Sequence, residues 1–403
     1  MDKIGELLTR GVEKIYPSKE ELEKALRSGR KLKLYQGFDP TGIQLHIGHM
    51  VGLRKLRQWQ DLGHHVIFLI GDGTGLAGDP SGKKHKREKF LTREELRKNS
   101  TDYIKQAGKI VRFEEVNPVE ILFNGDWLTK LILSDILEIA GHFTLQQLSE
   151  RDLFTDRIKR GEDVNLREFL YPLLQAYDSV AMDVDLEIGG TDQTFNMLCG
   201  RSLIKQMKNK DKFVMTTPLL TDSKGVKIGK TEGNVIALTD KPEDLFGKIM
   251  ALPDDVTLKG FEYLTSVPMD EVKKIEQKMD SMSQKKRLAF EIVKELNSDN
   301  EAKKAQIYFE KTVQEKEKPS EIKAVELPTS FTSSATIAEV LNAIGTVSSI
   351  SEGKRVTIQG GTSINDQRIT DPNEPIYPFL KTGEALVQTG KHKFVKIITT
   401  PDS

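Results

Sequence analysis

The chain has 403 residues, of which 37% are hydrophobic and 30% charged, and its 60 Lys and Arg balance its 60 Asp and Glu. A chain of this length is too long for one ordinary hydrophobic core and predicts two to three domains. Because the charges balance, the protein has no overall positive field that would attract nucleic acid. No apolar run approaches the ~20 residues of a membrane span. The charged N-terminus argues against a signal peptide, and the single Cys199 excludes an internal disulfide or cysteine-built zinc site. We expect a cytoplasmic protein without membrane contact or structural metal.

Residues 33–50, KLYQGFDPTGIQLHIGHM, form a short apolar strand, a Gly/Pro loop and a helix start. A helix start of this kind is an anion site, because free backbone N–H groups and the helix dipole point at the loop. His46 and His49 add donors able to reach a phosphate, and Gly48 allows close approach to the backbone. The alternative is a capped helix carrying two surface histidines, which the motifs further along the chain disfavour.

A second strand is predicted at 66–71, where VIFLIG is a continuous apolar run typical of a parallel sheet. Strand, helix and strand then make a right-handed βαβ unit, and ligands bind beyond the carboxyl ends of such strands. The Gly-rich loop 71–90 lies there and carries Asp79, Lys83 and Arg87. Its basic run is either a solvated face or, as we favour beside a phosphate site, a flap that closes over a polyphosphate.

The helix expected at 166–180, LREFLYPLLQAYDSV, places Tyr171, Gln175 and Asp178 on one face at i, i+4 and i+7. Buried polar groups need partners, so these three either form an internal hydrogen-bond network or hold a polar ligand. Alternating residues from Val180 to Ile188 predict a period-two strand, which ends at GGTDQ, 189–193. An apolar helix before them, within 131–143, is expected to supply core and a subunit contact.

Beyond a last strand at 213–220, the loop DSKGVKIGKTEGN, 222–234, carries Lys227, Lys230 and Thr231 between glycines. A Lys-rich loop is commonly a solvated surface, so this loop indicates a function only in combination with the other motifs of the chain. Lysine-rich helices are expected over 243–318, followed by a Pro/Ser/Thr-rich linker. The tail then reads as a short helix followed by strands and turns.

Together, YQGFDPTG…HIGH, GDPSGK, YPLLQAYD, GGTDQ and KIGKT resemble the signatures of bacterial-type tyrosyl-tRNA synthetases, which are class I aminoacyl-tRNA synthetases. The resemblance covers roughly the whole chain. It implies an α/β fold with a Rossmann-type parallel-sheet catalytic domain, a helical anticodon-binding region and a small α+β RNA-binding domain. The implied boundaries are 1–235 for the catalytic domain, 236–318 for the helical region, 319–335 for the linker and 336–403 for the alpha-L-type domain.

The resemblance also implies a role for individual residues. Tyr35 and Asp178 would hold the tyrosine hydroxyl, and the remaining tyrosine-binding residues would be Asp79, Tyr171, Gln175 and Gln193. ATP would be held by Gly37, Asp39, Thr41, His46, His49, Gly190, Asp192 and Lys230. The groups acting on the reacting phosphates would be His46, His49, Lys83, Arg87, Lys227, Lys230 and Thr231.

The implied reaction joins L-tyrosine to tRNA(Tyr) in two steps. The tyrosine carboxylate attacks the α-phosphate of ATP, and the adenylate then passes tyrosine to the terminal ribose of the tRNA. The carboxylate is already nucleophilic, so catalysis reduces to positioning and charge stabilisation, with Mg²⁺ neutralising the pyrophosphate. The family is homodimeric.

Three features depart from the family pattern. The KIGKT loop has Gly229 where the KMSKS signature has its first Ser. The segment KELNSDNEAKKAQ lacks an expected His-Gly pair. The tail carries seven basic and seven acidic side chains, which predicts weak or shape-based RNA binding.

Two rival functions are a tryptophanyl-tRNA synthetase and a non-catalytic RNA-binding protein on the same scaffold. The Tyr35–Asp178 pairing disfavours the first, because indole offers one donor and no phenolic oxygen. The intact HIGH and KIGKT motifs disfavour the second, because RNA binding does not require both lysines.

Overall fold

The computed structural model describes residues 2–42, 44–79, 90–149, 152–231, 234–314, 322–380, 383–390 and 393–400. The chain divides into two compact units, Met1–Ala302 and Lys303–Ser403. The division of the chain into functional domains remains a prediction, since compactness alone assigns no task to a segment.

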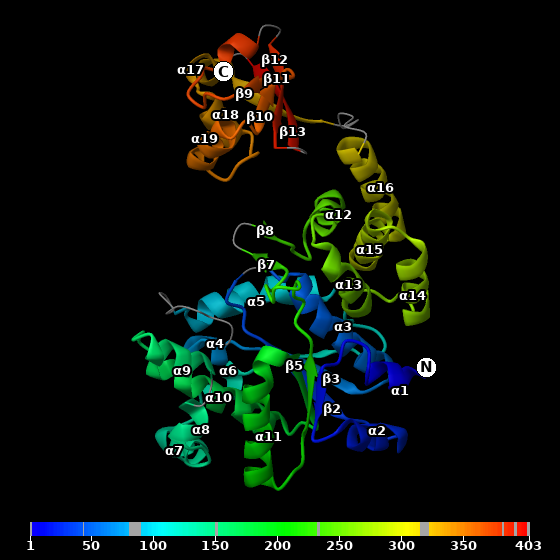
Figure 1. Ribbon diagram of the computed structural model, residues 1–403. Coiled ribbons are helices and arrows are strands. Elements are labelled where there is room, and N and C mark those ends of the chain that lie inside the picture. Colours follow the sequence, from blue (N-terminus) through cyan, green and yellow to red (C-terminus); the bar gives the residue numbers. More distant parts are fainter. Residues whose placement is uncertain are drawn as a thin grey trace. The chain divides into compact units, whose positions relative to one another are not determined.

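A six-stranded sheet organises the first unit, in the order β1 (Lys14–Tyr16), β6 (Phe213–Thr217), β5 (Leu186–Gly190), β2 (Lys33–Phe38), β3 (His65–Ile70) and β4 (Glu120–Phe123) (Figure 1). Strands β6, β5, β2, β3 and β4 run parallel, and β1 joins β6 antiparallel. The chain passes from β2 to one side and later returns to the other, so β2 and β5 flank a topological switch point where loops diverge. The predicted parallel α/β sheet is confirmed.

Helices cover the strands of the sheet through their apolar faces. Trp59, Leu53 and Leu56 of α3 (Ile47–Asp61) are fully buried, as the 3.6-residue spacing predicts. Helix α10 (Leu166–Met182) packs along α11 (Thr194–Lys208) through a shared apolar cluster. The other helices before β5 are α1 (Lys3–Leu7), α2 (Lys19–Arg27), α4 (Thr74–Ala77), α5 (Arg93–Ala107), α6 (Gly125–Leu128), α7 (Leu133–Gly141), α8 (Leu145–Ser149) and α9 (Asp152–Lys159).

The strand predicted from Val180 begins later than its alternating pattern indicates. Helix α10 continues through Met182, and the left-handed Asp183 (φ 49°, ψ 57°) ends it before β5 starts at Leu186. Val180 packs in the α10–α11 cluster, while Met182 packs against Tyr35 and Ile67 of the sheet. The two faces of the helix end are therefore both buried, and this mimics the period-two signal of a strand.

The segment after β6 enters a hairpin of β7 (Lys230–Thr231) and β8 (Asn234–Val235), and then a group of helices. Arg10 donates to the carbonyls of Phe261 and Thr265 at 2.9 and 2.6 Å, and α13 also packs on α3. Helix α13 is thus joined to the sheet by buried polar contacts and by packing on α3. The helices after β8 are α12 (Pro242–Met250), the 3₁₀ turn η2 (Asp254–Val256), α13 (Thr257–Leu264), α14 (Met269–Lys278), α15 (Ser281–Leu296), α16 (Asp299–Phe309) and the π-helix η3 (Glu310–Gln314). A further 3₁₀ turn, η1 (Thr191–Gln193), joins β5 to α11.

The second unit contains a five-stranded sheet in the order β11 (Gln367–Ile369), β10 (Thr362–Ile364), β12 (Glu384–Thr389), β13 (Lys393–Thr400) and β9 (Lys323–Pro328). Its helical elements are α17 (Thr329–Ser334), α18 (Ile337–Ala343), α19 (Ile350–Ile358) and η4 (Tyr377–Phe379). Strand β9 runs parallel to β13, and Leu327 belongs to this unit's core. The prediction that 319–335 is only a linker is therefore wrong over β9 and α17: KAVELP forms a strand at the sheet edge, and the hydroxyl-rich TSFTSS forms a short helix.

Candidate functional site

Polar side chains from the ends of three parallel strands form one connected chain of hydrogen bonds with α10. Thr74 Oγ1 donates to Asp39 Oδ1 at 2.7 Å. The two hydrogens of the Asn124 amide reach Thr74 Oγ1 at 2.9 Å and Asp178 Oδ2 at 3.0 Å. Asp39, expected on the nucleotide side, is thereby linked to Asp178, expected on the tyrosine side.

Asp178 is a buried carboxylate with donors on both oxygens. It is 1% exposed, and Trp127 Nε1 donates to its Oδ1 at 2.8 Å. Burial raises the pKa of Asp178 well above its ordinary value, while the bonds from Asn124 and Trp127 favour its charged form. Each carboxylate oxygen retains acceptor capacity for a further donor, such as a phenol hydroxyl. Sequence reasoning did not identify Asn124 or Trp127.

Tyr35 lies beside a buried ion pair that the sequence pattern did not reveal. The Tyr35 hydroxyl is 3.1 Å from Ser179 Oγ, and Lys212 Nζ donates to the same Ser179 Oγ at 2.7 Å. Lys212 also pairs with Glu187, and both side chains are inaccessible to solvent. Burial raises the pKa of the Tyr35 hydroxyl, and the nearby Glu187 and Asp178 carboxylates act in the same direction. The sole sequence signal was an acidic residue within the otherwise apolar strand β5.

The residues expected around an amino group separate into two hydrogen-bonded pairs. Gln193 Nε2 donates to Asp79 Oδ2 at 2.9 Å, whereas Gln175 Nε2 donates to Glu187 Oε1 at 3.0 Å. Within the described chain, the buried Gln175 Oε1 has no hydrogen-bond partner. Burial raises the pKa of Tyr171, and so do the Asp39 and Asp79 carboxylates that lie near it. The neighbourhood is therefore rich in negative charge and acceptors.

The start of α3 differs from the anion site that was expected there. The N–H of Ile47 donates to Ile236 O at 3.0 Å, Gly48 N–H to His46 Nδ1 at 3.1 Å, and His49 N–H to His46 O at 2.8 Å. The prediction of free backbone N–H groups at this end is wrong, because the chain after β8 and the His46 side chain occupy them.

The two histidines cap the helix reciprocally. His49 Nδ1 accepts from His46 N–H at 3.2 Å, and the rings lie 4.0 Å apart. Since both Nδ1 atoms accept, each neutral ring carries its proton on Nε2. The imidazoles thus present Nε2–H donors, so the predicted donor chemistry belongs to the rings and not to the backbone.

The structure brings the GGTDQ and KIGKT segments together. Lys227 Nζ lies 2.8 Å from Asp192 Oδ2. Gly229 has φ 104°, and a Cβ at this position would lie 3.0 Å from His46 Nδ1. Glycine therefore allows the loop to rest against the start of α3. Lys230 and Thr231 make up β7, and their side chains lie outside the part of the chain that the structure describes.

The remaining predicted residues are more peripheral. Gly37, in the second half of β2, and Thr41, in the loop after β2, are both exposed. Gly190 is the last residue of β5 and lies beside Asp192. Lys83 and Arg87 lie outside the described residues, together with the rest of 80–89. Their assignment to a flap stays a prediction.

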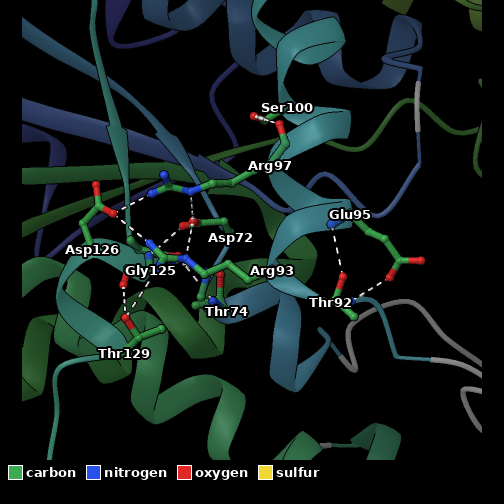
Figure 2. A network of polar contacts seen from close by, with 12 residues as sticks. Asp72, Thr74, Thr92, Arg93, Glu95, Arg97, Ser100, Gly125, Asp126 and Thr129 are labelled. Atoms are coloured by element: carbon green, nitrogen blue, oxygen red, sulfur yellow. Dashed lines mark hydrogen bonds and ion pairs between the residues drawn. The ribbon is translucent and has the colours of Figure 1, made fainter.

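A cluster of ion pairs holds the loop after β3 in place (Figure 2). Arg93 Nε and Arg97 Nε of α5 donate to Asp72 Oδ2 at 2.8 and 2.7 Å, and Gly125 N–H donates to Oδ1 at 2.7 Å. Both arginines also reach Asp126 of α6, at 2.7 and 2.5 Å. Asp72 is fully buried and stands two residues before Thr74. The cluster therefore anchors the segment that connects Asp39 to Asn124.

The arrangement suits a ligand with an amino group, a hydroxyl and phosphates. Buried carboxylates can accept from the first two, and the imidazoles and Lys227 can donate to phosphate oxygens. In the described part of the chain, no group of three or more His, Cys, Asp or Glu gathers as a metal site. Over the same residues, no helix is long and apolar enough to span a membrane.

Comparison with known proteins identifies what the chain is similar to. A family model described as tRNA synthetases class I (W and Y) matches residues 27–314. The chain is 40% identical to a tyrosine–tRNA ligase of Thermotoga maritima over 97% of this chain and 96% of that one. It is also 40% identical to a tyrosine–tRNA ligase of Aquifex aeolicus, covering 94% and 95%.

Solved structures extend the similarity to the fold. A tyrosyl-tRNA synthetase of Archaeoglobus fulgidus complexed with L-tyrosine superposes with a TM-score of 0.60 at 22% identity, covering 76% of this chain and 100% of that one. A truncated mitochondrial tyrosyl-tRNA synthetase of Aspergillus nidulans gives 0.63 at 24% identity, covering 76% and 92%. The class I synthetase fold is thereby confirmed.

The Asp72 cluster yields a prediction about stability in acid. Two arginines and an N–H hold the pKa of Asp72 below its ordinary value against the opposing effect of burial. A carboxylate with a lowered folded-state pKa stabilises the fold above its unfolded pKa, and this contribution is lost as pH falls through the folded-state value. Asp72→Asn should therefore lose about 1–3 kcal/mol of unfolding free energy near neutral pH, and the deficit should shrink below about pH 4.

Denaturant unfolding across pH checks this expectation. Asp126→Asn is the matched control, because Asp126 accepts from the same arginines but its side chain is 55% exposed, and a smaller effect is expected. A deficit for Asp72→Asn that stays constant from pH 6 to about pH 3 would show that the charge of Asp72 is not the stabilising feature.

Proposed function

The chain belongs to the class I tRNA synthetases of the tryptophan and tyrosine group, and we propose that the pocket bounded by Asp178, Tyr35 and Asp79 selects L-tyrosine. Within this family the chain is a tyrosine–tRNA ligase. It activates L-tyrosine with ATP to tyrosyl-adenylate and pyrophosphate, then transfers tyrosine to the 3′ end of tRNA(Tyr).

The observation that carries the proposed pocket is the buried Asp178 with its two fixed donors. A carboxylate held by Asn124 and Trp127 cannot turn away, so its remaining acceptor capacity has a set direction. A phenol can donate to Asp178 and accept from the Tyr35 hydroxyl. Phenylalanine would leave both groups unpaired in a buried site, which is costly. An indole offers one N–H and no oxygen, so tryptophan is disfavoured for the same reason.

The α-ammonium of tyrosine would lie among the acceptors at the other end of the pocket. Asp79 and Tyr171 are the proposed contacts, with Gln193 holding Asp79 in place. Gln175 contributes through its Oε1, which accepts from no group in the described chain. Its Nε2 remains with Glu187, so the amide is oriented before any ligand arrives.

ATP would bind along the loops that join β2, α3, β5 and β7. The Nε2–H groups of His46 and His49 and the side chains of Lys227, Lys230 and Thr231 are proposed donors to its phosphates. The residues assigned to the rest of the nucleotide are Gly37, Asp39, Thr41, Gly190 and Asp192. Lys83 and Arg87 are proposed to act on the pyrophosphate, and Mg²⁺ would enter with ATP and neutralise part of its charge.

The chemistry then follows from the charges. A tyrosine carboxylate oxygen attacks the α-phosphorus, the bond to the bridging oxygen breaks, and pyrophosphate leaves. Donors that follow the negative charge onto the phosphates stabilise the transition state, and a general base is unnecessary. In the second step the terminal ribose hydroxyl of the tRNA attacks the adenylate carbonyl, and AMP leaves.

Tyrosine-dependent exchange of labelled pyrophosphate into ATP tests the proposed amino acid specificity. Exchange with tyrosine and none above background with tryptophan is expected. Exchange supported by tryptophan would contradict the pocket. A folded preparation without exchange would favour the non-catalytic RNA-binding role instead.

The anticodon-side and tail assignments are also proposals. Residues 236–318 would recognise the anticodon, and residues 336–403 would bind tRNA as a separate module. In support, the C-terminal unit has its own buried core. Two of its cations are paired with acids, Lys396 with Glu384 at 2.6 Å and Arg355 with Glu352 at 3.9 Å, which fits weak electrostatic binding. We place the enzyme in the cytoplasm, because its tRNA substrate serves translation.

A homodimer is proposed through an apolar surface on α7, α8 and α10. Its side chains are 62–76% exposed, although they are large and apolar: Leu133, Leu137, Leu145 and Leu166. Helix α7 packs against α10, so α7 and α10 share one region of the first unit (Figure 1). Exposed apolar patches of this kind mark association surfaces, and a second copy is the proposed occupant.

Asp178→Asn should relax amino acid discrimination. The amide keeps the size of the side chain but loses a charged acceptor, which is worth about 1.5–3 kcal/mol for the hydroxylated substrate. The ratio of kcat/KM for tyrosine to that for phenylalanine should fall about 10- to 100-fold, with the phenylalanine value nearly unchanged. An unchanged ratio in a folded variant would make Asp178 a structural residue.

Lys230→Ala should slow adenylate formation about 10²- to 10³-fold with little change in tyrosine affinity, because this donor acts on charge that develops in the transition state. Stopped-flow activation measures the rate. Lys224→Ala provides a control on the same loop, since Lys224 is exposed and precedes the motif. Weakened tyrosine binding with a normal activation rate would refute the assignment.

Leu137→Asp should convert the dimer to a monomer, because a charge would be buried in an apolar interface. Sedimentation velocity at several concentrations measures the association state. Ile358→Asp is the control, since Ile358 is similarly exposed at 64% but belongs to α19 of the second unit and not to this set of helices. A monomeric wild-type chain, or a Leu137→Asp variant that still dimerises, would rule out this interface.

A further inference from the structure

Asn196 is a buried polar side chain that has no part in the reaction described above. It lies in the first turn of α11 and is 0% exposed. Its Nδ2 donates to Gln193 Oε1 at 2.8 Å, whereas its Oδ1 is buried and has no hydrogen-bond partner among the residues that the structure describes. A buried acceptor without a donor is costly, so stability alone does not explain an amide at this position.

Gln193 uses its side chain for contacts outside the backbone of its own helix. It is the N-cap residue of α11, where a side chain commonly accepts from an N–H of the first turn, but it makes no such bond. Its Nε2 instead donates to Asp79 Oδ2 at 2.9 Å, in a segment 114 residues earlier in the chain. The Gln193 amide therefore lies between Asp79 and Asn196 and bonds to both.

The carboxylate of Asp79 fixes the direction of these bonds. A carboxylate accepts and does not donate, so the Gln193 amide turns its NH₂ group toward Asp79. The carbonyl oxygen of Gln193 then faces Asn196, which in turn presents its own NH₂ group. A reversed Gln193 amide would set an oxygen against Asp79 and two NH₂ groups against each other. The donor of Asn196 thus favours the one orientation of Gln193 that binds Asp79.

The end of β5 restricts the rest of the Gln193 side chain. A Cβ at Gly189 would lie 3.3 Å from Gln193 Cβ and 2.9 Å from Met197 Sδ. Glycine therefore lets Gln193 and the fully buried Met197 rest directly against the strand. Packing places the stem of Gln193, and the hydrogen bonds of Asn196 and Asp79 orient its amide.

Asp79 stands where the chain leaves α4. Gly78, at φ 81°, ends that helix, and Asp79 follows it outside any helix or strand. The Tyr171 hydroxyl, the other proposed contact of the ammonium, bonds to Asp39. The bond from Gln193 ties Asp79 to α11, which itself packs along α10. The position of the Asp79 carboxylate therefore depends on the start of α11.

We propose that Asn196 is a positioning residue for the amino end of the substrate: it orients the Gln193 amide, and Gln193 holds the Asp79 carboxylate where it accepts from the α-ammonium. This inference rests on the proposed tyrosine pocket. Asn196 does not touch the substrate and acts through two hydrogen bonds in series. Its effect is confined to the ammonium end, because Asp178 at the phenol end is held by other donors.

Asn196→Leu tests this role, because leucine has a similar size and removes both the donor and the unpaired acceptor. The KM for tyrosine and the inhibition constant of tyramine, which keeps the ammonium, should rise about three- to tenfold. The inhibition constant of desaminotyrosine, which lacks the ammonium, should stay the same, and so should kcat and the tyrosine-to-phenylalanine ratio of kcat/KM. The midpoint of denaturant unfolding should change little, since a buried unpaired oxygen is lost together with the bond.

Ser202→Ala is the control on the same helix. It removes the acceptor of a bond from Gln206 Nε2 at 2.9 Å, away from the GGTDQ segment, and should leave all these constants at their wild-type values. If Asn196→Leu does not fold, Asn196→Ala takes its place, because alanine also lacks the donor and is too small to clash.

A combination with Gln193→Met tests whether Asn196 acts through Gln193. Methionine has a similar length but cannot bond to Asp79 as the amide does. In the Gln193→Met background, Asn196→Leu should therefore weaken tyrosine and tyramine no further. Losses that multiply in the double variant would overturn the proposed series of bonds.

The single variant can overturn the proposal in two ways. Equal weakening of tyramine and desaminotyrosine by Asn196→Leu would show a general disturbance of the pocket. Unchanged constants for tyrosine and tyramine would show that the Gln193 amide needs no support from Asn196.

The proposed pocket and the positioning role fail in distinguishable ways. If Asp79→Asn leaves the affinities for tyrosine and tyramine unchanged, Asp79 does not bind the ammonium and the pocket assignment itself is wrong. If Asp79→Asn weakens both ligands and Asn196→Leu weakens neither, the pocket stands and the positioning role is wrong.

Discussion

A carboxylate without access to water needs donors that cannot leave it, and Asp178 imposes this requirement on the first unit. Its two oxygens are held by Asn124 and Trp127, which follow β4 and lie some fifty residues earlier in the chain. Asn124 in turn holds Thr74, and Thr74 holds Asp39 at the end of β2. The ends of three strands are therefore tied to one side chain of α10. A substitution that frees any of these donors leaves a buried polar group unpaired.

The proposed nucleotide side of the site depends on contacts between segments that are far apart in sequence. The chain after β8 takes the N–H of Ile47, and Gly229 rests against His46. Lys227 meets Asp192 from another loop. Since the backbone donors of α3 are already used, recognition of phosphate in the proposed site would fall to side chains, whose positions follow those of the two loops. Movement of either loop would therefore change several of the proposed phosphate donors at once.

Much of the fold was predictable because it follows from local pattern. The buried strand at 66–71, the apolar face of α3 and the parallel α/β sheet all agree with the sequence. Two assignments failed where the pattern has two physical causes. Val180 and Met182 alternate because both faces of the end of α10 are buried, and the Pro-, Ser- and Thr-containing segment before 335 includes an edge strand, KAVELP, and a short helix, TSFTSS. In each case the tertiary environment, which a short window does not contain, decided the conformation.

The sequence by itself determined the motifs, their order and hence the family, because these depend on residue types at short spacing. It also placed Tyr35, Asp178, His46 and Lys227 among the functional candidates. Only the tertiary structure decided which groups satisfy them. Glu187 and Lys212 are 25 residues apart and belong to no motif, yet they meet in the interior behind Tyr35. Which two opposite charges pair in the interior depends on how the strands and helices pack, because a buried charge needs an opposite charge within contact distance.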